Sequence, residues 1–520
     1  MNKKKTDGVR LNSLQDIGLI AGPVLAVCMY FLLPDQYMGS DGATAFLTSS
    51  AKATIAVLTL MAVWWLSEAI DISATALLPV ALFPLLGVAD IRTAASSYGH
   101  PLIFLYLGGF IIALSMGRWG LDRRISLVTL NWVGTRPGAM LAGFMLATAV
   151  LSGVVSNTAT TAMMLPIAVS VIHLVSKDNN LISPKCQSNF ATCLMLAIAY
   201  SASVGGMMTI VGTPTNVFLI SYLRDNIPEP YRIDVSFARW MLIGVPLVLV
   251  FLPAIWFLLC KVIYPVRFRE VPGGKALIQQ ELENIGGFNR GEAVTLAVFL
   301  LTAALWIFLP LIKQIHWETG GEPFFPFASL TDSGVVMVTA TLLFVIPVPG
   351  EERRFVMNWE TVAKMPWGIL ILFGGGLSLA AAVDANGVAE FLGSFSRYIK
   401  GVPPIILVLV VTTAIVFLTE LTSNVATTAA VVPILAALAP GLSIHPYDLV
   451  VPATLAASCA FMLPVATPPN AIVFGSGRVT MRQMARAGFW LNLVGIVIVI
   501  VVLTVLDNQV ADIEPSSNSA

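Results

Sequence analysis

Long apolar runs separated by short polar segments dominate the chain. Most runs are close to the ~20 residues that an α-helix needs to cross a bilayer. Strands of a membrane barrel would be shorter and would alternate strictly. We therefore expect an all-α polytopic membrane protein with about eleven spanning helices, near 17–34, 53–69, 71–88, 101–117, 190–222, 238–264, 291–312, 331–348, 366–384, 452–477 and 488–506.

Two further apolar stretches, 139–176 and 403–438, each contain a cluster of polar residues. The chain reads LSGVVSNTATTAMMLP from residue 151 and LTELTSNVATTAAVVP from residue 418, and eight of the sixteen positions are identical. The Ser-Asn pairs beginning at Ser156 and Ser423 lie 267 residues apart. This repetition indicates that the polar residues have a shared role in both stretches.

Composition supports the membrane interpretation and excludes several other classes. Apolar residues make up 57% of the chain and charged residues 11%, with a mean hydropathy of +0.84, whereas soluble domains contain about 25% charged residues. The five cysteines and four histidines show no metal-ligand spacing. No nucleophile–base pair, organic cofactor motif or nucleic-acid motif is present, so we expect neither an enzyme nor a nucleic-acid partner.

The distribution of lysine and arginine decides how the two polar stretches cross the membrane. If each is a hairpin that enters and leaves by one face, and the N-terminus is inside, 21 of the 29 basic residues are cytoplasmic and 8 are outside. This is the bias of the positive-inside rule. If only one of the two stretches were a span, every later loop would lie on the opposite face of the membrane and the charge bias would be lost. We therefore predict two re-entrant hairpins, a cytoplasmic N-terminus and an external C-terminus.

The chain also repeats outside the hairpins. LGGF at 107–110 corresponds to FGGG at 373–376, and GTPTN at 212–216 corresponds to ATPPN at 466–470. An odd number of spans separates equivalent points, so the copies have opposite orientation, as in many secondary transporters. We therefore expect five segments: an N-terminal segment with the first helix (1–50), a first repeat (51–265), a cytoplasmic linker (266–290), a second repeat (291–507) and a C-terminal tail (508–520).

The four interruptions suggest a site for an anion and cations. Backbone that leaves helical form in a bilayer is tolerated where it lines a cavity. The N–H groups at the start of each following helix favour an anion. Carbonyl oxygens of unwound backbone, with Ser, Thr and Asn side chains, suit Na⁺. The pattern therefore predicts an anion carried together with cations.

These motifs, together with Trp64-Trp65-Leu66-Ser67-Glu68-Ala69 ahead of Thr75-Ala76-Leu77-Leu78-Pro79, resemble the divalent anion/sodium symporter family. The resemblance runs from about residue 50 to 500. It implies eleven membrane helices with two re-entrant hairpins, a homodimer, an elevator motion, and a dicarboxylate, citrate or sulfate as substrate.

The resemblance also implies particular residues. The first sodium site would contain Ser152, Ser156, Asn157 and the carbonyl of Gly212. The second would contain Thr419, Asn424 and the carbonyls of Thr422 and Ala466. The substrate would be bound by Asn157, Thr158, Thr213 and Pro214 on one side, and by Ser423, Asn424, Thr467 and Pro468 on the other.

Some residues leave two interpretations open. Val425 stands where the SNT pattern has a threonine, which removes a hydroxyl and affects the preferred anion. The paired threonines that follow each tip can pack or bind a ligand: Thr160, Thr161, Thr427 and Thr428. Glu420 is an ionisable group inside a hairpin, so it is either a proton relay or a structural partner. Gly153 replaces it in the first copy, which favours the structural interpretation.

The leading hypothesis is a sodium-coupled symporter that imports C4-dicarboxylates, such as succinate, malate or fumarate, across the bacterial inner membrane. Na⁺ is then a co-transported ion. A sodium-independent or proton-linked anion exchanger of the same fold, or a citrate or sulfate transporter, is the alternative. A membrane enzyme or a passive channel is a further alternative. Counterflow against preloaded substrate would distinguish a carrier from these, because a simple channel cannot show it.

Overall fold

The computed structural model describes residues 13–39, 43–177, 182–227, 231–232, 235–319, 322–348, 355–398, 401–442 and 444–511. Contacts divide the chain into two compact units, and each unit takes segments from both predicted repeats. The basic residues before residue 13 and the tail from residue 512 lie outside the described residues.

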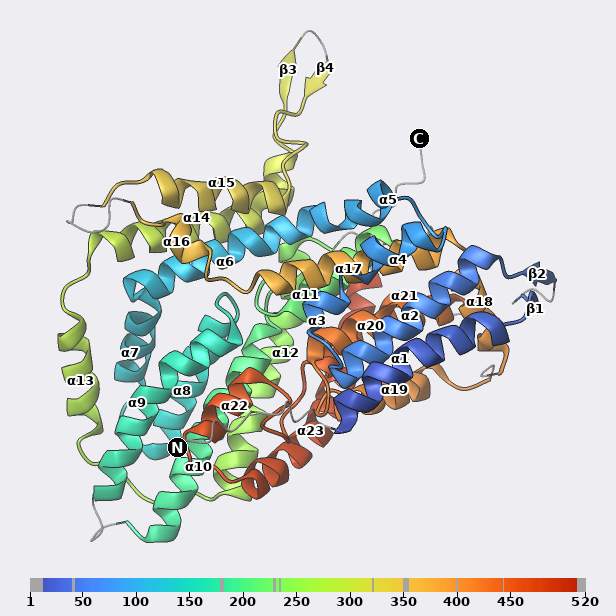
Figure 1. Ribbon diagram of the computed structural model, residues 1–520. Coiled ribbons are helices and arrows are strands. Elements are labelled where there is room, and N and C mark those ends of the chain that lie inside the picture. Colours follow the sequence, from blue (N-terminus) through green and yellow to red (C-terminus); the bar gives the residue numbers. More distant parts are fainter. Residues whose placement is uncertain are drawn as a thin grey trace, which may run out of the picture. The chain divides into compact units, whose positions relative to one another are not determined.

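The first unit consists mainly of the chain's first helices and parts of its second half (Figure 1). Its elements are α1 (Ser13–Leu32), β1 (Gln36–Met38), β2 (Thr44–Phe46), α2 (Ser49–Ser67), α3 (Ile72–Thr75), α4 (Leu78–Leu85), α5 (Ile91–Ser96), η1 (Ser97–Gly99), α17 (Trp367–Ala385), α18 (Val388–Ser394), η3 (Phe395–Tyr398), α20 (Asn424–Leu438) from Ala426 onward, and η4 (Pro440–Leu442). Strands β1 and β2 form an antiparallel pair.

The second unit contains most of the central chain and the C-terminal helices. Its elements are α6 (Pro101–Trp119), α7 (Leu121–Val133), α8 (Pro137–Ser152), α9 (Asn157–Lys177), α10 (Pro184–Gly206), α11 (Pro214–Asp225), α12 (Phe237–Phe257), the π-helix η2 (Leu258–Ile263), α13 (Gly274–Ile285), α14 (Arg290–Lys313), β3 (Trp317–Thr319), β4 (Glu322–Phe324), α15 (Asp332–Val345), α16 (Trp359–Val362), α19 (Pro404–Leu418), α21 (Pro446–Ala457), α22 (Pro468–Gly475) and α23 (Met481–Ala511).

The predicted all-helical membrane fold is confirmed in its broad form. Within the described residues, nine helices are long and apolar enough to cross a membrane. The predicted spans 190–222 and 452–477 are each interrupted, and 71–88 forms two short helices. In the predicted hairpins, α8, α19 and α20 have 16, 15 and 15 residues, which is short for a span, whereas α9 has 21. The count of eleven spans stays a prediction.

Local sequence explains where several helices begin and end. Asn289 and Glu292 form a capping box at the start of α14, which satisfies two N–H groups that have no partner within the helix. Pro101 and Pro184 occupy the first position of α6 and α10, where a missing N–H costs nothing. Gly120, with φ of 76°, ends α6 and lets α7 start in a new direction.

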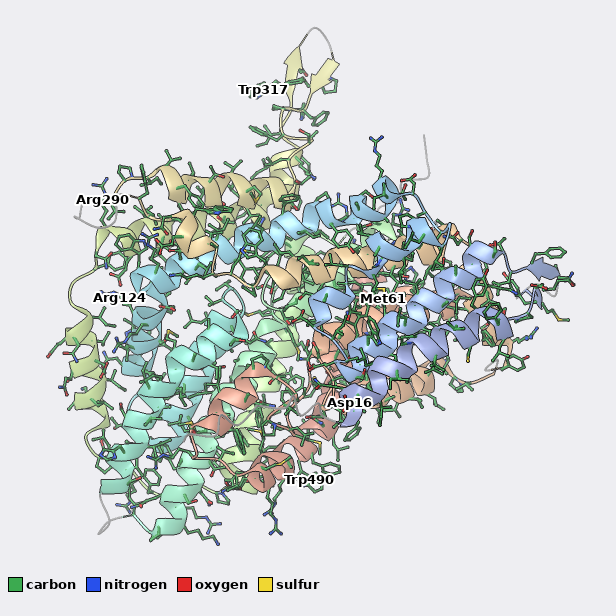
Figure 2. The ribbon with its side chains drawn as sticks, in the orientation of Figure 1. Asp16, Met61, Arg124, Arg290, Trp317 and Trp490 are labelled. Atoms are coloured by element: carbon green, nitrogen blue, oxygen red, sulfur yellow. The ribbon has the colours of Figure 1, made fainter. Side chains whose placement is uncertain are left out.

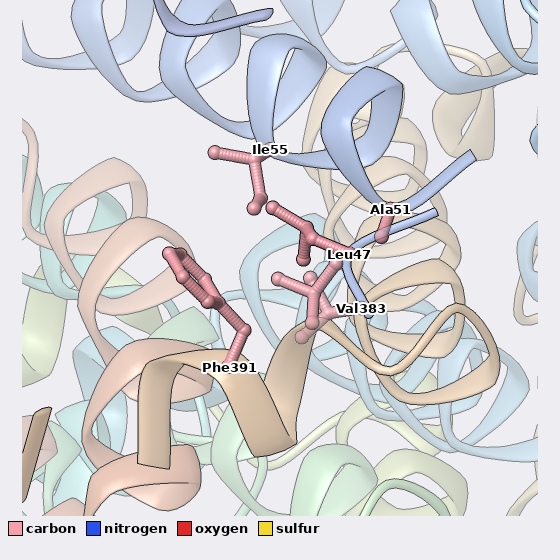
Figure 3. Packing of buried hydrophobic residues seen from close by; sticks show 6 residues of the cluster. Leu47, Ala51, Ile55, Val383 and Phe391 are labelled. Atoms are coloured by element: carbon pink, nitrogen blue, oxygen red, sulfur yellow. The ribbon is translucent and has the colours of Figure 1, made fainter. Parts of the chain in front are cut away.

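Apolar packing closes the first unit around α2, α17 and α18. Leu47, Ala51 and Ile55 contact Val383, Val388 and Phe391, all at most 5% exposed (Figure 3). The glycine runs of the sequence have a packing role. A Cβ on Gly375 would lie 2.1 Å from the carbonyl oxygen of Ala76, and one on Gly108, in the second unit, 2.8 Å from the side chain of Val336.

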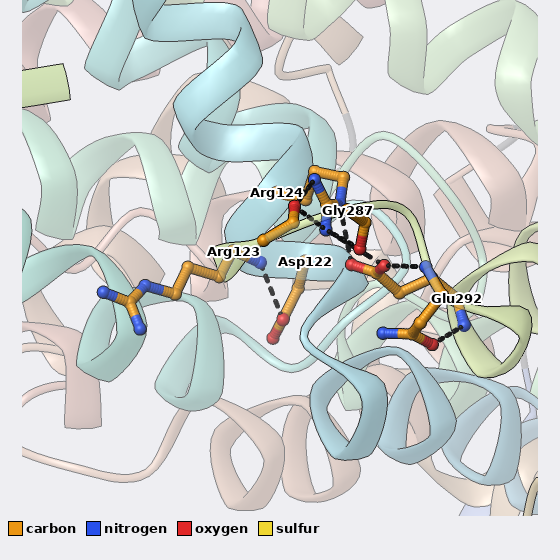
Figure 4. Close-up of polar contacts among 7 residues, drawn as sticks. Asp122, Arg123, Arg124, Gly287 and Glu292 are labelled. Carbon is orange, nitrogen blue, oxygen red and sulfur yellow. Dashed lines mark hydrogen bonds and ion pairs between the residues drawn. The ribbon is translucent and has the colours of Figure 1, made fainter. Parts of the chain in front are cut away.

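A charged pair fastens α7 to the start of α14 in the second unit (Figure 4). Arg124 Nε and Nη2 donate to Glu292 Oε1 and Oε2 at 2.7 and 3.1 Å. The guanidinium also donates to the carbonyls of Gly286 and Gly287. Glu292 is fully buried while Arg124 is 16% exposed. Figure 2 shows Arg124 on α7 and Arg290 at the start of α14, whereas Trp317 lies on the projecting β3–β4 hairpin.

We predict that Arg124→Ala lowers the free energy of unfolding by about 3–5 kcal/mol, because Glu292 is left as a buried charge without its partner. Tryptophan fluorescence during SDS titration of the protein in mixed micelles measures this change. Arg123→Ala is the control, since the Arg123–Glu281 pair is 48% and 23% exposed and pairs of this kind contribute about 0–1 kcal/mol. Equal losses in both variants would contradict the prediction.

Candidate functional site

The first predicted tip joins α8 to α9 through four non-helical residues. Ser152, the last residue of α8, has its Oγ 2.6 Å from Asn157 Oδ1 and 2.6 Å from the carbonyl oxygen of Ala202 on α10. A serine hydroxyl has one proton, so it can donate to only one of these two acceptors at a time. Three oxygens therefore converge with too few protons between them, which is an arrangement that a small cation stabilises.

The first broken helix lies against this tip. Between α10 and α11 the chain unwinds, and Thr213 is extended (φ −141°, ψ 142°) directly before Pro214. A Cβ on Gly206 would lie 2.6 Å from Asn157 Oδ1 and 3.1 Å from the Gly212 carbonyl oxygen. The glycine is therefore required where the break approaches the tip. The predicted partners Asn157 and Gly212 are thus brought together.

The second predicted tip has the same geometry. Thr419 Oγ1 is 2.7 Å from Asn424 Oδ1 and 2.9 Å from the carbonyl oxygen of Ala457. Thr419 and Asn424 correspond to Ser152 and Asn157 at an offset of 267 residues. Again one hydroxyl proton faces two acceptor oxygens. The same oxygen cluster is therefore built twice from different parts of the chain.

The second broken helix also repeats the first. Thr467 is extended (φ −142°, ψ 149°) before Pro468, and its Oγ1 accepts from the N–H of Asn470. These backbone angles agree with those of Thr213 to within a few degrees. Both helices that follow the breaks thus begin with a proline in the first position, and their free N–H groups favour negative charge.

The remaining predicted residues have more varied surroundings. Ser156 Oγ accepts from the N–H of Ala159 and so caps α9. Thr422 Oγ1 donates to the Leu418 carbonyl, within its own segment. For Ala466, the backbone N–H donates to the carbonyl of Leu463.

Exposure differs among the predicted substrate ligands. Thr213 and Thr467 are each 5% exposed. Ser423 and Pro214 are partly buried, whereas Thr158 and Pro468 are exposed. The threonines behind the tips favour the packing interpretation: all four are at most 2% exposed, and Thr161 Oγ1 donates to the Asn157 carbonyl.

Glu420 is tied to the second break by its carboxylate. Its oxygens accept from the backbone N–H groups of Phe461, Met462 and Leu463 at 2.7–3.0 Å, and from Asn492 Nδ2 at 2.8 Å. At the equivalent place in the first copy, a Cβ on Gly153 would meet the Met208 methyl group at 2.4 Å. These bonds favour the structural interpretation of Glu420.

Sequence reasoning missed part of this geometry. The carbonyls of Ala202 and Ala457 complete the two oxygen clusters, but any residue supplies a carbonyl, so no sequence signal marks them. Asn492 and the N–H groups that surround Glu420 were missed because they lie 41–72 residues further along the chain, beyond any local pattern. Gly206 could have been noticed, since a glycine pair ends the apolar run before GTPTN.

Comparison with known proteins defines the class. The family described as "Sodium:sulfate symporter transmembrane region" matches residues 23–510. The sodium-dependent dicarboxylate transporter SdcS of Staphylococcus saprophyticus is 39% identical over 515 residues, covering 99% of this chain and 95% of that protein. SdcS of Staphylococcus aureus is 39% identical over 493 residues, covering 94% and 90%.

Two solved structures share the fold. The Alcanivorax borkumensis YdaH transporter superposes with a TM-score of 0.58 at 12% identity, covering 95% of this chain and 98% of that one. Neisseria gonorrhoeae MtrF, described as an antimetabolite efflux pump, gives a TM-score of 0.59 at 13% identity, covering 96% of each chain. At these identities the likeness concerns the fold alone.

The fold and the paired interruptions define a polytopic membrane transporter. The chain belongs to the sodium:sulfate symporter family, which is the divalent anion/sodium symporter family that its motifs resemble. It is therefore a transporter and not an enzyme.

We predict that Glu420→Gln destabilises the protein, because an amide offers one acceptor oxygen where the carboxylate offers two. Each backbone N–H left without an acceptor costs about 1–3 kcal/mol. Thermal unfolding in detergent measures the loss, with Glu283→Gln on the exposed face of α13 as the control. A proton relay would instead change the pH profile of uptake while leaving the unfolding temperature unchanged, and that result would overturn the structural interpretation.

Proposed function

We propose that this protein is a sodium-coupled symporter that imports C4-dicarboxylates such as succinate, malate or fumarate. The observation that carries the proposal is the pair of oxygen clusters at Ser152–Asn157 and Thr419–Asn424. In each cluster a hydroxyl with one proton faces two acceptor oxygens, and the partial negative charges of these oxygens would attract Na⁺. Oxygen ligands are those that hard cations of this kind take.

The dianion would bind beside the cations. The N-termini of α9 and α20 begin with Asn157 and Asn424, and those of α11 and α22 begin with Pro214 and Pro468. Each presents free N–H groups, which favour carboxylates. In this scheme each tip asparagine contacts both its sodium ion and the substrate. Binding of one ligand therefore stabilises the site of the other, which is the origin of coupling.

The choice of a dicarboxylate is supported by the names of both SdcS relatives. The family description names sulfate, which is also a dianion. Val425 removes one hydroxyl from the second tip, and a hydrogen bond to a charged group contributes about 1.5–3 kcal/mol. Citrate and sulfate are therefore tested beside succinate.

The transport cycle follows from the predicted architecture. The short helices α8, α19 and α20 support two re-entrant hairpins within inverted repeats. Sodium would shape the tips first and the dianion would follow. The substrate-carrying part would then move across the bacterial inner membrane as an elevator against a homodimeric scaffold, with the N-terminus cytoplasmic and the C-terminus outside. No organic cofactor is needed for this cycle.

We predict that Asn157→Ala and Asn424→Ala each reduce sodium-driven uptake about 10- to 100-fold, since a lost interaction with a charged group of 1.5–3 kcal/mol corresponds to that factor. The measurement is uptake of labelled succinate into proteoliposomes, with an inward gradient of Na⁺ or of K⁺. Asn386→Ala is the matched control, because in the described part of the chain its side-chain amide donates to the Ala382 carbonyl, one turn earlier in the first unit, and Asn386 belongs to neither tip.

The cation comparison decides between coupling modes. Uptake that requires Na⁺ supports the symporter. Equal uptake with Na⁺ and K⁺, together with counterflow against preloaded succinate, would replace it by a sodium-independent or proton-linked exchanger. Uptake without counterflow would indicate a channel and would overturn the carrier mechanism.

A further inference from the structure

Two buried asparagines follow the breaks and have no place in the scheme above. Asn216 ends the GTPTN motif and Asn470 ends the ATPPN motif, 254 residues later. Each is the third residue of its helix, α11 or α22, and each is 0% exposed. A fully buried amide is costly unless its polar atoms are hydrogen-bonded. The partners that each amide takes therefore indicate its role.

Each amide donates to carbonyls of the unwound segment before its own helix. Asn216 Nδ2 is 2.9 Å from the carbonyl oxygen of Thr209, 3.3 Å from that of Met207 and 3.5 Å from that of Gly206. Asn470 Nδ2 is 3.1 Å from those of both Ala460 and Leu463.

The two sets of acceptors are equivalent. Ala460 and Leu463 correspond to Gly206 and Thr209 at the same offset of 254 residues that relates the two asparagines. The structure therefore contains the same hydrogen-bond arrangement twice. In each copy an asparagine amide donates to two carbonyls that lie three residues apart, at or after the end of the preceding helix.

Only one half of each amide is used. Oδ1 of Asn216 and Oδ1 of Asn470 have no hydrogen-bond partner in the part of the chain that the structure describes. The donor half faces backbone carbonyls at and beyond the ends of α10 and α21, of which that of Leu463 also accepts from the N–H of Ala466. A threonine or aspartate could not supply two N–H donors from one atom. The role of each asparagine is therefore to donate its amide N–H groups to the carbonyls of the break.

The backbone that each asparagine bonds lies close to the predicted sodium ligands. Gly206, whose carbonyl faces Asn216, lies against Asn157 Oδ1 and the Gly212 carbonyl. In the second copy Leu463 donates its N–H to Glu420 and offers its carbonyl to Asn470. Glu420 is the residue after Thr419. Asn216 is therefore linked to the first oxygen cluster through Gly206, and Asn470 is linked to the second through Leu463 and Glu420. In the part of the chain that the structure describes, neither side chain bonds to a predicted sodium ligand.

We propose that Asn216 and Asn470 are positioning residues, each of which fixes the geometry and hence the affinity of one sodium site. This inference rests on the proposed sodium-coupled function. Partners behind metal ligands typically change affinity about 10- to 100-fold when they are removed. Asn216 sets the site at the first tip and Asn470 sets the site at the second.

The test uses the full-length protein in proteoliposomes. Asn216→Leu and Asn470→Leu keep the size of the side chain and remove both donors. We expect each to raise the half-saturating Na⁺ concentration about 10- to 100-fold, while most of the maximal uptake returns at saturating Na⁺. Asn189→Leu is the matched control, because Asn189 Nδ2 also donates to a backbone carbonyl, that of Pro265, but lies outside the breaks.

Double variants assign each asparagine to its site. Asn216→Leu should be non-additive with Ser152→Ala and additive with Thr419→Val, whereas Asn470→Leu should show the reverse, because neighbours in one network couple and separate sites do not. Additivity in every combination, or an unchanged Na⁺ dependence in both leucine variants, would overturn the proposal.

Folding and function are checked separately. The unfolding temperature in choline buffer reports on folding, and its increase on adding Na⁺ reports on binding without transport. Asn216→Ser and Asn470→Ser keep one donor and should give intermediate Na⁺ affinities. If maximal uptake instead falls across the variants in step with their unfolding temperature in choline buffer, the asparagines have only a structural role, and the proposal is overturned. Sodium-independent uptake by the unaltered protein would instead refute the proposed function, whatever the variants do.

Discussion

The constraint on which the rest depends is that backbone polar groups inside a membrane need partners. Two helices of this protein stop and restart within apolar surroundings, after Gly206 and after Ala457. The freed carbonyls and N–H groups are met by polar side chains from elsewhere in the same unit. Asn216 and Asn470 take carbonyls, and Glu420 takes N–H groups. The breaks are stable because these partners are buried with them.

The same constraint explains why a binding site exists there. Near the ends of α10 and α21, the tip hydroxyls of Ser152 and Thr419 bond to the carbonyls of Ala202 and Ala457 beside Asn157 and Asn424. Each cluster holds more acceptors than protons. The partial negative charges of these oxygens then favour a cation, and the adjoining helix N-termini favour an anion. In the proposed cycle these two preferences are coupled through the tip asparagines.

The two copies differ in how each hairpin tip is joined to its broken helix. Glu420 fastens the second tip to three N–H groups of its break, whereas in the first copy Thr209 Oγ1 of the break donates to the Gly153 carbonyl of the tip. Hydrogen bonds to a carboxylate are stronger than a hydrogen bond between two neutral groups. At this position the second tip is therefore joined to its break by more and stronger hydrogen bonds than the first, although the two oxygen clusters match.

The sequence by itself determined the membrane class, the positions of the interruptions and the duplicated motifs, because hydrophobic length and glycine or proline breaks are local properties. The resemblance of its motifs to the symporter family also implied that Asn157 acts with Ser152 and Asn424 with Thr419. Only the tertiary structure decided that the carbonyls of Ala202 and Ala457 complete the clusters, and that Glu420 receives N–H groups 41–43 residues away. Backbone groups are the same in every residue, so their roles depend on where the chain brings them.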